Sequence, residues 1–225
     1  MPGHLDQSIA KLKDFEGCVP WMYRDTAGKV TVGVGLMLPN AAAACAQPFV
    51  TAEGLPSQNL ASPEQIAEDF ARVAALPPGK LPEFYKSAAS PELPQPAIEA
   101  NLTTVLTEFE ATLRARIPSY DQLPDPVKVA LMDMAYNLGP TGLLNGYPRL
   151  LEAVETGAWA QAATECTRGG IGHSRNAWTQ QQFLSAVMAT IRAAASMASE
   201  IEAELVDAKP EGWFARLRRL LRRRK

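Results

Sequence analysis

The sequence predicts an α+β fold that is mostly α-helical, with a small β-hairpin lobe and a larger helical lobe. Two short strand-like runs, residues 21–24 and 29–33, flank a cluster of turn-forming residues at 25–28. Apolar residues recur at helical spacing through most of the remaining chain. Residues 127–138 are nearly all apolar over the length of one helix, which predicts a central buried helix.

The first helix is predicted over residues 6–15, because Leu5, Ile9 and Leu12 recur at helical spacing. Gly17, just after this run, is a typical stop signal. The strand-like runs of the hairpin follow, and the turn residues between them predict a tight connection.

Alternation separates two faces in the second strand of the hairpin. The apolar face, which we expect to point into the core, holds Val30, Val32 and Val34. The small or polar face, which we expect to line a cleft, holds Lys29, Thr31, Gly33 and Gly35.

Helices are predicted for most of the chain after the hairpin. Residues 37–62 have little periodicity, but Ser62 followed by a proline is a typical N-terminal cap. The predicted helices span residues 63–76, 97–117, 127–138, 147–155, 159–166 and 179–208. The last one has a continuous apolar stripe made of Phe183, Val187, Ile191, Ala194, Ala198, Ile201 and Leu205.

Charge is unevenly distributed along the chain. The net charge of −2 divides into +7 on residues 209–225 and −9 on residues 1–208. In the basic tail, helical spacing places Trp213, Leu217, Leu220 and Leu221 on one face, which is typical of a cationic amphipathic helix. We therefore expect the tail to bind anionic lipid or lipopolysaccharide through Trp213, Arg216, Arg218, Arg219 and Arg222.

Two other interpretations of the tail remain open. A basic terminus that only aids solubility is the simpler one, but the ordered apolar face favours lipid binding. Nucleic-acid binding is disfavoured because no recognisable nucleic-acid module accompanies the arginines. His4 and His173 lie far apart without a cysteine or carboxylate at ligand spacing, so we expect no metal site and no cofactor.

Glu16, Asp25 and Thr31 form the most informative pattern for chemistry. Cleavage of a glycosidic bond needs one carboxyl group held protonated and another held ionised nearby. Glu16 at a helix end beside Phe15 and Cys18 is expected in a weakly polar setting that keeps it protonated, whereas Asp25 in a polar turn stays ionised. The alternative is that both are surface carboxylates and that Asp25 only forms the turn; spacing alone favours this alternative.

Four sequence blocks resemble phage-type lysozymes, glycoside hydrolase family 24. Residues 15–35 match the N-terminal signature, with eight residues between Glu16 and Asp25, five more before Thr31, and then Gly-x-Gly. Residues 130–139 (ALMDMAYNLG) resemble the central helix of the family with its aromatic-Asn/Gln-x-Gly ending. The remaining blocks are residues 157–163 and 175–176.

The resemblance implies hydrolysis of the β-1,4 bond between N-acetylmuramic acid and N-acetylglucosamine in peptidoglycan. Glu16 would be the acid and Asp25 the base or water-positioning carboxylate, while Thr31 would orient the water. Tyr23, Asn137 and Arg175 would bind substrate or support the site. Asn137 as a helix cap and Arg175 as a surface ion-pair partner remain open alternatives.

The resemblance also implies a lysozyme-like domain over residues 1–208, with a cleft between its lobes and an insert at about 37–96, followed by the tail at 209–225. Leu36 departs from the histidine that usually follows Gly-x-Gly in the family. We expect a monomer without a nucleic-acid partner, made in the cytoplasm without a Sec signal and acting on peptidoglycan in the cell envelope. A lytic transglycosylase and a non-catalytic module that binds cell wall or membrane are the alternatives.

Overall fold

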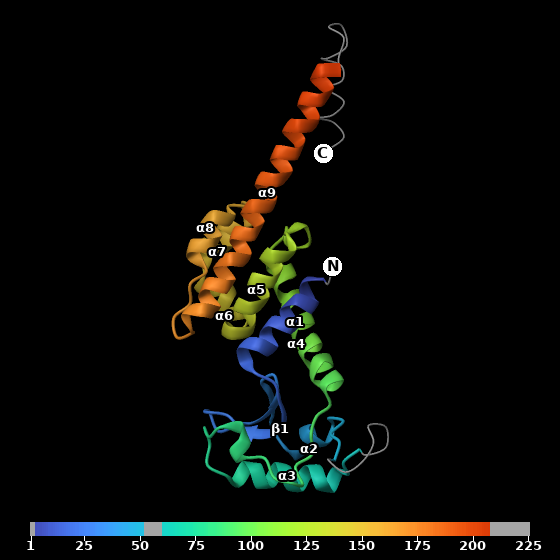
Figure 1. Cartoon of the computed structure of the whole chain (residues 1–225). Coiled ribbons are helices and arrows are strands. Elements are labelled where there is room, and N and C mark those ends of the chain that lie inside the picture. The colour runs from blue at the N-terminus through green and yellow to red at the C-terminus, as the bar shows by residue number, and fades with distance from the viewer. Residues whose placement is uncertain (1–2, 52–59, 208–225) are drawn as a thin grey trace. The chain divides into compact units, whose positions relative to one another are not determined.

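The computed structural model describes residues 3–51 and 60–207 and divides the chain into two compact units, Met1–Tyr147 and Pro148–Lys225. The structure is mostly helical with one small antiparallel sheet (Figure 1), so the predicted α+β class is confirmed at that level. Each unit is described in turn.

The first unit contains a sheet with the strand order β1 (Val19–Arg24), β2 (Val30–Gly33) and β3 (Leu36–Leu38). The hairpin is as predicted, but β3 was not expected. As the central strand, β2 is buried along its whole length, and Thr31 is only 4% exposed. The β2 strand is therefore covered on both sides at Thr31, a residue expected on the face that lines a cleft.

The helices of the first unit are long where the sequence is periodic. They are α1 (His4–Glu16), α2 (Ala41–Cys45), α3 (Pro63–Ala75), α4 (Gln95–Arg116), α5 (Asp125–Leu138) and α6 (Pro140–Gly146), with 3-10 turns at Pro82–Phe84 and Tyr120–Gln122. The α5 helix is buried at nearly every position from Val127 to Ala135, as predicted for a central helix.

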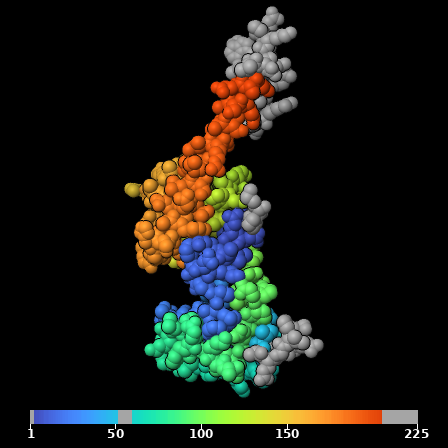
Figure 2. Space-filling view, in the orientation of Figure 1, coloured from blue at the N-terminus to red at the C-terminus, as the bar shows by residue number. Residues whose placement is uncertain are grey.

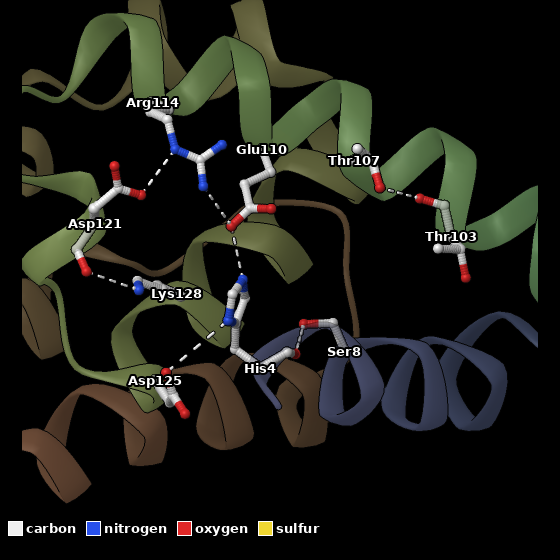
Figure 3. Close-up of polar contacts among 9 residues, drawn as sticks. All are labelled: His4, Ser8, Thr103, Thr107, Glu110, Arg114, Asp121, Asp125 and Lys128. Atoms are coloured by element: carbon white, nitrogen blue, oxygen red, sulfur yellow. Dashed lines mark hydrogen bonds and ion pairs between the residues drawn. The ribbon is translucent and has the colours of Figure 1, made fainter. Parts of the chain in front are cut away.

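Polar contacts hold the N-terminal end of α1 on α4 and α5. The imidazole of His4 shares a hydrogen bond with Oε1 of Glu110, with Nε2 and Oε1 2.7 Å apart, and Arg114 reaches the same carboxylate at 3.3 Å (Figure 3). Arg114 also donates to Oδ1 of Asp121 at 2.8 Å. At its other end α1 carries Glu16, so these contacts help to fix the direction in which that residue is presented.

The predicted insert at 37–96 supports the sheet from one side. Its α3 helix begins as predicted, with the Ser62 hydroxyl accepting a hydrogen bond from the Gln65 N–H in a capping box. The segment after α3 binds β1 directly, since the Trp21 indole donates to the Pro82 carbonyl at 2.9 Å and the Leu93 N–H donates to the Pro20 carbonyl at 2.6 Å.

The second unit consists of α7 (Pro148–Glu155), α8 (Trp159–Glu165) and α9 (His173–Asp207) in the part of it that the structure describes. In this part α7 packs against α8, and α8 packs against α9. Figure 2 shows the C-terminal part of α9, coloured red, projecting beyond the rest of this unit. The α9 helix begins six residues before the predicted start at residue 179. None of the described helices has the combination of length and apolar character needed to cross a membrane.

Candidate active site

Glu16 is the last residue of α1 and is exposed to solvent. Gly17 follows it with a φ of +77°, a left-handed conformation that glycine adopts without strain, and this turns the chain from α1 toward β1. The sequence analysis expected a weakly polar setting for Glu16, and its exposure does not match that expectation.

Asp25 lies in the hairpin turn, and the backbone of Lys29 holds it there. The Lys29 N–H donates a hydrogen bond to Asp25 Oδ1 at 2.7 Å, and the Asp25 N–H donates to the Lys29 carbonyl at 2.9 Å. Oδ2 of Asp25 takes part in no hydrogen bond among the described residues. The turn therefore fixes one carboxylate oxygen and leaves the other for water or substrate.

Thr31 is tied to the same backbone group. Its hydroxyl donates to the Lys29 carbonyl at 3.3 Å, a long hydrogen bond, which leaves the lone pairs of Oγ1 to accept from another donor. In the antiparallel register Thr31 lies directly opposite Tyr23, so the two side chains share one face of the sheet. The register shifts between Val19 and Tyr23, an irregularity of the kind that re-aims side chains beside functional sites.

Tyr23 is a half-buried tyrosine whose hydroxyl has a raised pKa. Burial raises the pKa of the Tyr23 hydroxyl, and the negative charges of Asp25 and Glu16 raise it further. Both carboxylates therefore act on the same phenol, which stays protonated and available as a hydrogen-bond donor. Tyr23 was expected only as a supporting residue, and in the structure it lies opposite Thr31 in the sheet.

The insert holds the turn of Asp25 from outside the hairpin. The Gly79 N–H donates to the Asp25 carbonyl at 3.2 Å, and the Arg24 guanidinium donates to the carbonyls of Gly28 and Leu76. These contacts restrain the turn at its tip, so the conformation of Asp25 depends on both the hairpin and the segment after α3.

A second predicted block meets the first near the β2–β3 turn. The hydroxyl of Tyr136, from α5, donates to the carbonyl of Val34. Beside this contact lies a mostly apolar cavity of about 190 Å³. Gly33, on the same face of β2 as Thr31, is one of its wall residues; the others are Val34, Gly35, Leu36, Met37, Leu93, Ile98, Asn101, Leu102, Val105 and Tyr136.

The other predicted site residues lie on two different units. Asn137 is exposed near the C-terminal end of α5 in the first unit. Arg175 is buried in the first turns of α9 in the second unit, where its carbonyl accepts a hydrogen bond from Thr179 at 2.9 Å. The predicted supporting role of Arg175 stays a prediction, and the predicted lipid-binding residues of the tail lie outside the described residues.

Sequence reasoning missed Arg168, which is only 2% exposed. Its guanidinium donates to the Thr179 hydroxyl at 2.7 Å, and its backbone N–H and carbonyl pair with the side-chain amide of Asn176 at 3.0 and 2.8 Å. These bonds join the end of α8 to the start of α9. An isolated arginine after a helix gives no sequence signal for such burial, because arginine is normally exposed.

The first unit holds groups that are suited to acid–base chemistry. It offers an exposed carboxyl at a helix end, a carboxylate fixed through one oxygen, and a neighbouring hydroxyl and phenol. The chain matches no protein-family model, and a search of curated proteins likewise found no match. The function assigned to the site must therefore come from its geometry and from the sequence motifs.

Proposed function

We propose that this chain is a lysozyme-like muramidase that hydrolyses the β-1,4 bond between N-acetylmuramic acid and N-acetylglucosamine in peptidoglycan. The observation that carries the proposal is the turn that ties Asp25 and Thr31 to the backbone of Lys29, so that a carboxylate and a hydroxyl lie close together. The order and spacing of the four sequence blocks supply the substrate class. The contact between Tyr136 and Val34 supports it further, since it joins two of those blocks within one unit.

The proposed reaction is a direct displacement. Glu16, exposed at the end of α1, donates a proton to the glycosidic oxygen as the bond breaks. Asp25 Oδ2 accepts a proton from the attacking water, while the Lys29 N–H keeps Oδ1 in place. Oγ1 of Thr31 accepts a hydrogen bond from the same water. This route inverts the anomeric centre and requires the two carboxyl groups to stand roughly 6.5–9.5 Å apart, so that water fits between them.

Two other functions make different demands on these residues. A lytic transglycosylase needs the acid but has no use for Asp25 and Thr31, because it adds no water. A non-catalytic module that binds cell wall or membrane needs none of the three. The hydrogen bonds that tie Asp25 and Thr31 to Lys29 favour the hydrolase, since they hold two water-directing groups at one place.

The test compares Glu16→Gln with Asp14→Asn, a change at a carboxylate of the same helix with a 68% exposed side chain. Release of soluble muropeptides from purified peptidoglycan should fall by at least about 100-fold in Glu16→Gln, because the proton donor is lost. Asp14→Asn should keep the wild-type rate. Equal rates in the two variants would remove Glu16 from the mechanism, and anhydro-muramic acid products would assign the transglycosylase instead.

We also propose that the tail brings the protein to an anionic envelope surface, where its substrate lies. Deleting residues 209–225 should then reduce lysis of intact cells and leave the rate on purified peptidoglycan unchanged. Equal loss on both substrates would show that the deletion harms the enzyme itself, and no loss on either would contradict the proposal.

A further inference from the structure

The apolar stripe of α9 continues past the helices that cover its first half. Phe183 is fully buried, whereas Ile191, two helical turns further on, is 55% exposed. Ala194 and Ala198 on the same stripe are exposed as well. Among the described elements of this unit, α8 packs on α9, and Figure 1 shows the C-terminal half of α9 extending beyond both α7 and α8.

A groove lies where the apolar stripe of α9 passes beyond the helix that packs on it, α8. It has a volume of about 430 Å³ and lies between the start of α8 and the middle of α9. Its walls include Trp159 from α8 and Val187, Thr190 and Ile191 from α9. The exposed stripe is therefore continuous with an apolar hollow, which is a surface suited to packing against another apolar segment.

The charge beside the exposed stripe of α9 indicates which kind of segment can bind there. Between residues 193 and 207 the chain has four acidic residues, Glu200, Glu202, Glu204 and Asp207, and no basic residue. At about 100° per residue, Glu202 and Glu204 fall on opposite flanks of Ile201. Acidic flanks repel an anionic lipid surface and attract a cationic segment, so lipid is a poor partner for this face.

We propose that the tail of the same chain, residues 213–225, folds back antiparallel along α9 and covers the face formed by Ala194, Ala198 and Ile201. The tail has the required composition, an apolar face beginning at Trp213 and a net charge of +7 over residues 209–225. The alanines of α9 permit close approach of a second helix.

The length of the tail also agrees with the length of the exposed part of α9. Residues 208–212, which include Pro210 and Gly212, suffice for the connection between two antiparallel helices. Thirteen residues, the number from 213 to 225, rise about 20 Å in an ideal helix, which matches the rise from Asp207 back to Ala194 along α9. Attachment through five residues gives the tail an effective concentration on the order of millimolar, which favours it over a second molecule.

The consequence is a competition for the tail. Its Trp and Leu face cannot bind α9 and an anionic membrane at once, so an anionic surface would release the tail from α9. This inference does not depend on the hydrolase activity and is tested without it.

Hydrogen exchange of the backbone amides at 191–204 tests the proposal in the full-length protein. Protection there should fall by about tenfold or more on deletion of residues 209–225, since α9 then loses its cover. The charge variant Glu202→Lys/Glu204→Lys should have the same effect in the full chain. The matched control, Glu152→Lys/Glu155→Lys, reverses two acids of α7 in the same unit and should leave the protection unchanged.

Protection of the amides of α7 and α8 shows that each variant has folded. Equal protection at 191–204 in the full-length and deleted proteins would overturn the proposal. A protection that rises with protein concentration, together with a doubled mass in light scattering, would also overturn it and assign the face to a second copy. Vesicles containing anionic lipid should lower the protection of the full-length protein, while neutral vesicles should not.

Discussion

Thr31 shows how much of the candidate site depends on single hydroxyl groups. Its hydroxyl donates to the Lys29 carbonyl and the residue is only 4% exposed, so the strand fixes the orientation of the hydroxyl. A group held in this way can direct one water molecule without losing entropy at the moment of reaction.

Replacing Thr31 with valine should therefore lower kcat by about 10- to 100-fold with little change in KM, because the water loses its acceptor while substrate binding is unaffected. Thr26→Val, at an exposed threonine of the same turn, is the control. Steady-state rates on soluble glycan fragments check this prediction, and an unchanged kcat in Thr31→Val would contradict it.

Two tyrosines predict how stability depends on alkaline pH. Burial raises the pKa of Tyr23 and of Tyr120, with Glu110 adding to the effect at Tyr120. The unfolded chain loses its phenolic protons near pH 10, whereas the folded protein still retains them. The folded state then binds more protons, so its free energy of unfolding must fall as the pH rises above about 10.

Urea unfolding at about pH 8 and about pH 11 measures this slope. Tyr23→Phe and Tyr120→Phe should each lose less stability between the two pH values than the wild type does. A wild-type stability that rises over this interval would contradict the prediction.

At the scale of elements, the orientation of α1 depends on contacts at its N-terminal end. His4→Ala removes a hydrogen bond from the carboxylate of Glu110, whose side chain is only 8% exposed. The variant should lose about 1–3 kcal/mol of unfolding free energy, because a buried acceptor loses a partner. Asp14→Ala, which breaks a pair at a 68% exposed side chain, should change stability by less than about 1 kcal/mol. Denaturant titration checks both, and equal losses would contradict the assigned role of His4.

The β2–β3 turn depends on Gly33. Its φ of +67° is rarely adopted by other residues, and a Cβ there would lie 3.2 Å from Ile98 of α4. Gly33→Ala should destabilise the protein by about 1–3 kcal/mol. Gly169→Ala, at a glycine whose added Cβ would meet no atom within 4 Å, should be nearly neutral. Thermal unfolding distinguishes the two, and a neutral Gly33→Ala would contradict this account of the turn.

Across the whole chain, sequence patterns predicted the elements whose burial is apolar and periodic. The elements that were not predicted lack such a periodic apolar pattern. The β3 strand has only three residues and exists through its pairing with β2, while α2 is a short run of alanines ending in a cysteine. The start of α9 was not predicted because two of its buried positions, Arg175 and Thr179, are polar. The apolar residues there consequently do not recur at helical spacing.

The candidate site was predictable only in part. The polar turn around Asp25 follows from its residues, and the bond from the Lys29 N–H agrees with that prediction. The position of Tyr23 opposite Thr31 could not be foreseen, because it depends on the register between β1 and β2. The contact of Tyr136 with Val34 joins residues 102 positions apart, which no local pattern reports.

The most direct test of the proposed muramidase activity is to digest peptidoglycan in oxygen-18 water. The fresh product is then analysed by mass spectrometry and by NMR. Our account predicts one heavy oxygen on the new reducing end of N-acetylmuramic acid, initially as the inverted α-anomer, and no such product from Glu16→Gln. Anhydro-muramic acid ends without heavy oxygen, or product formation that persists in Glu16→Gln, would contradict it.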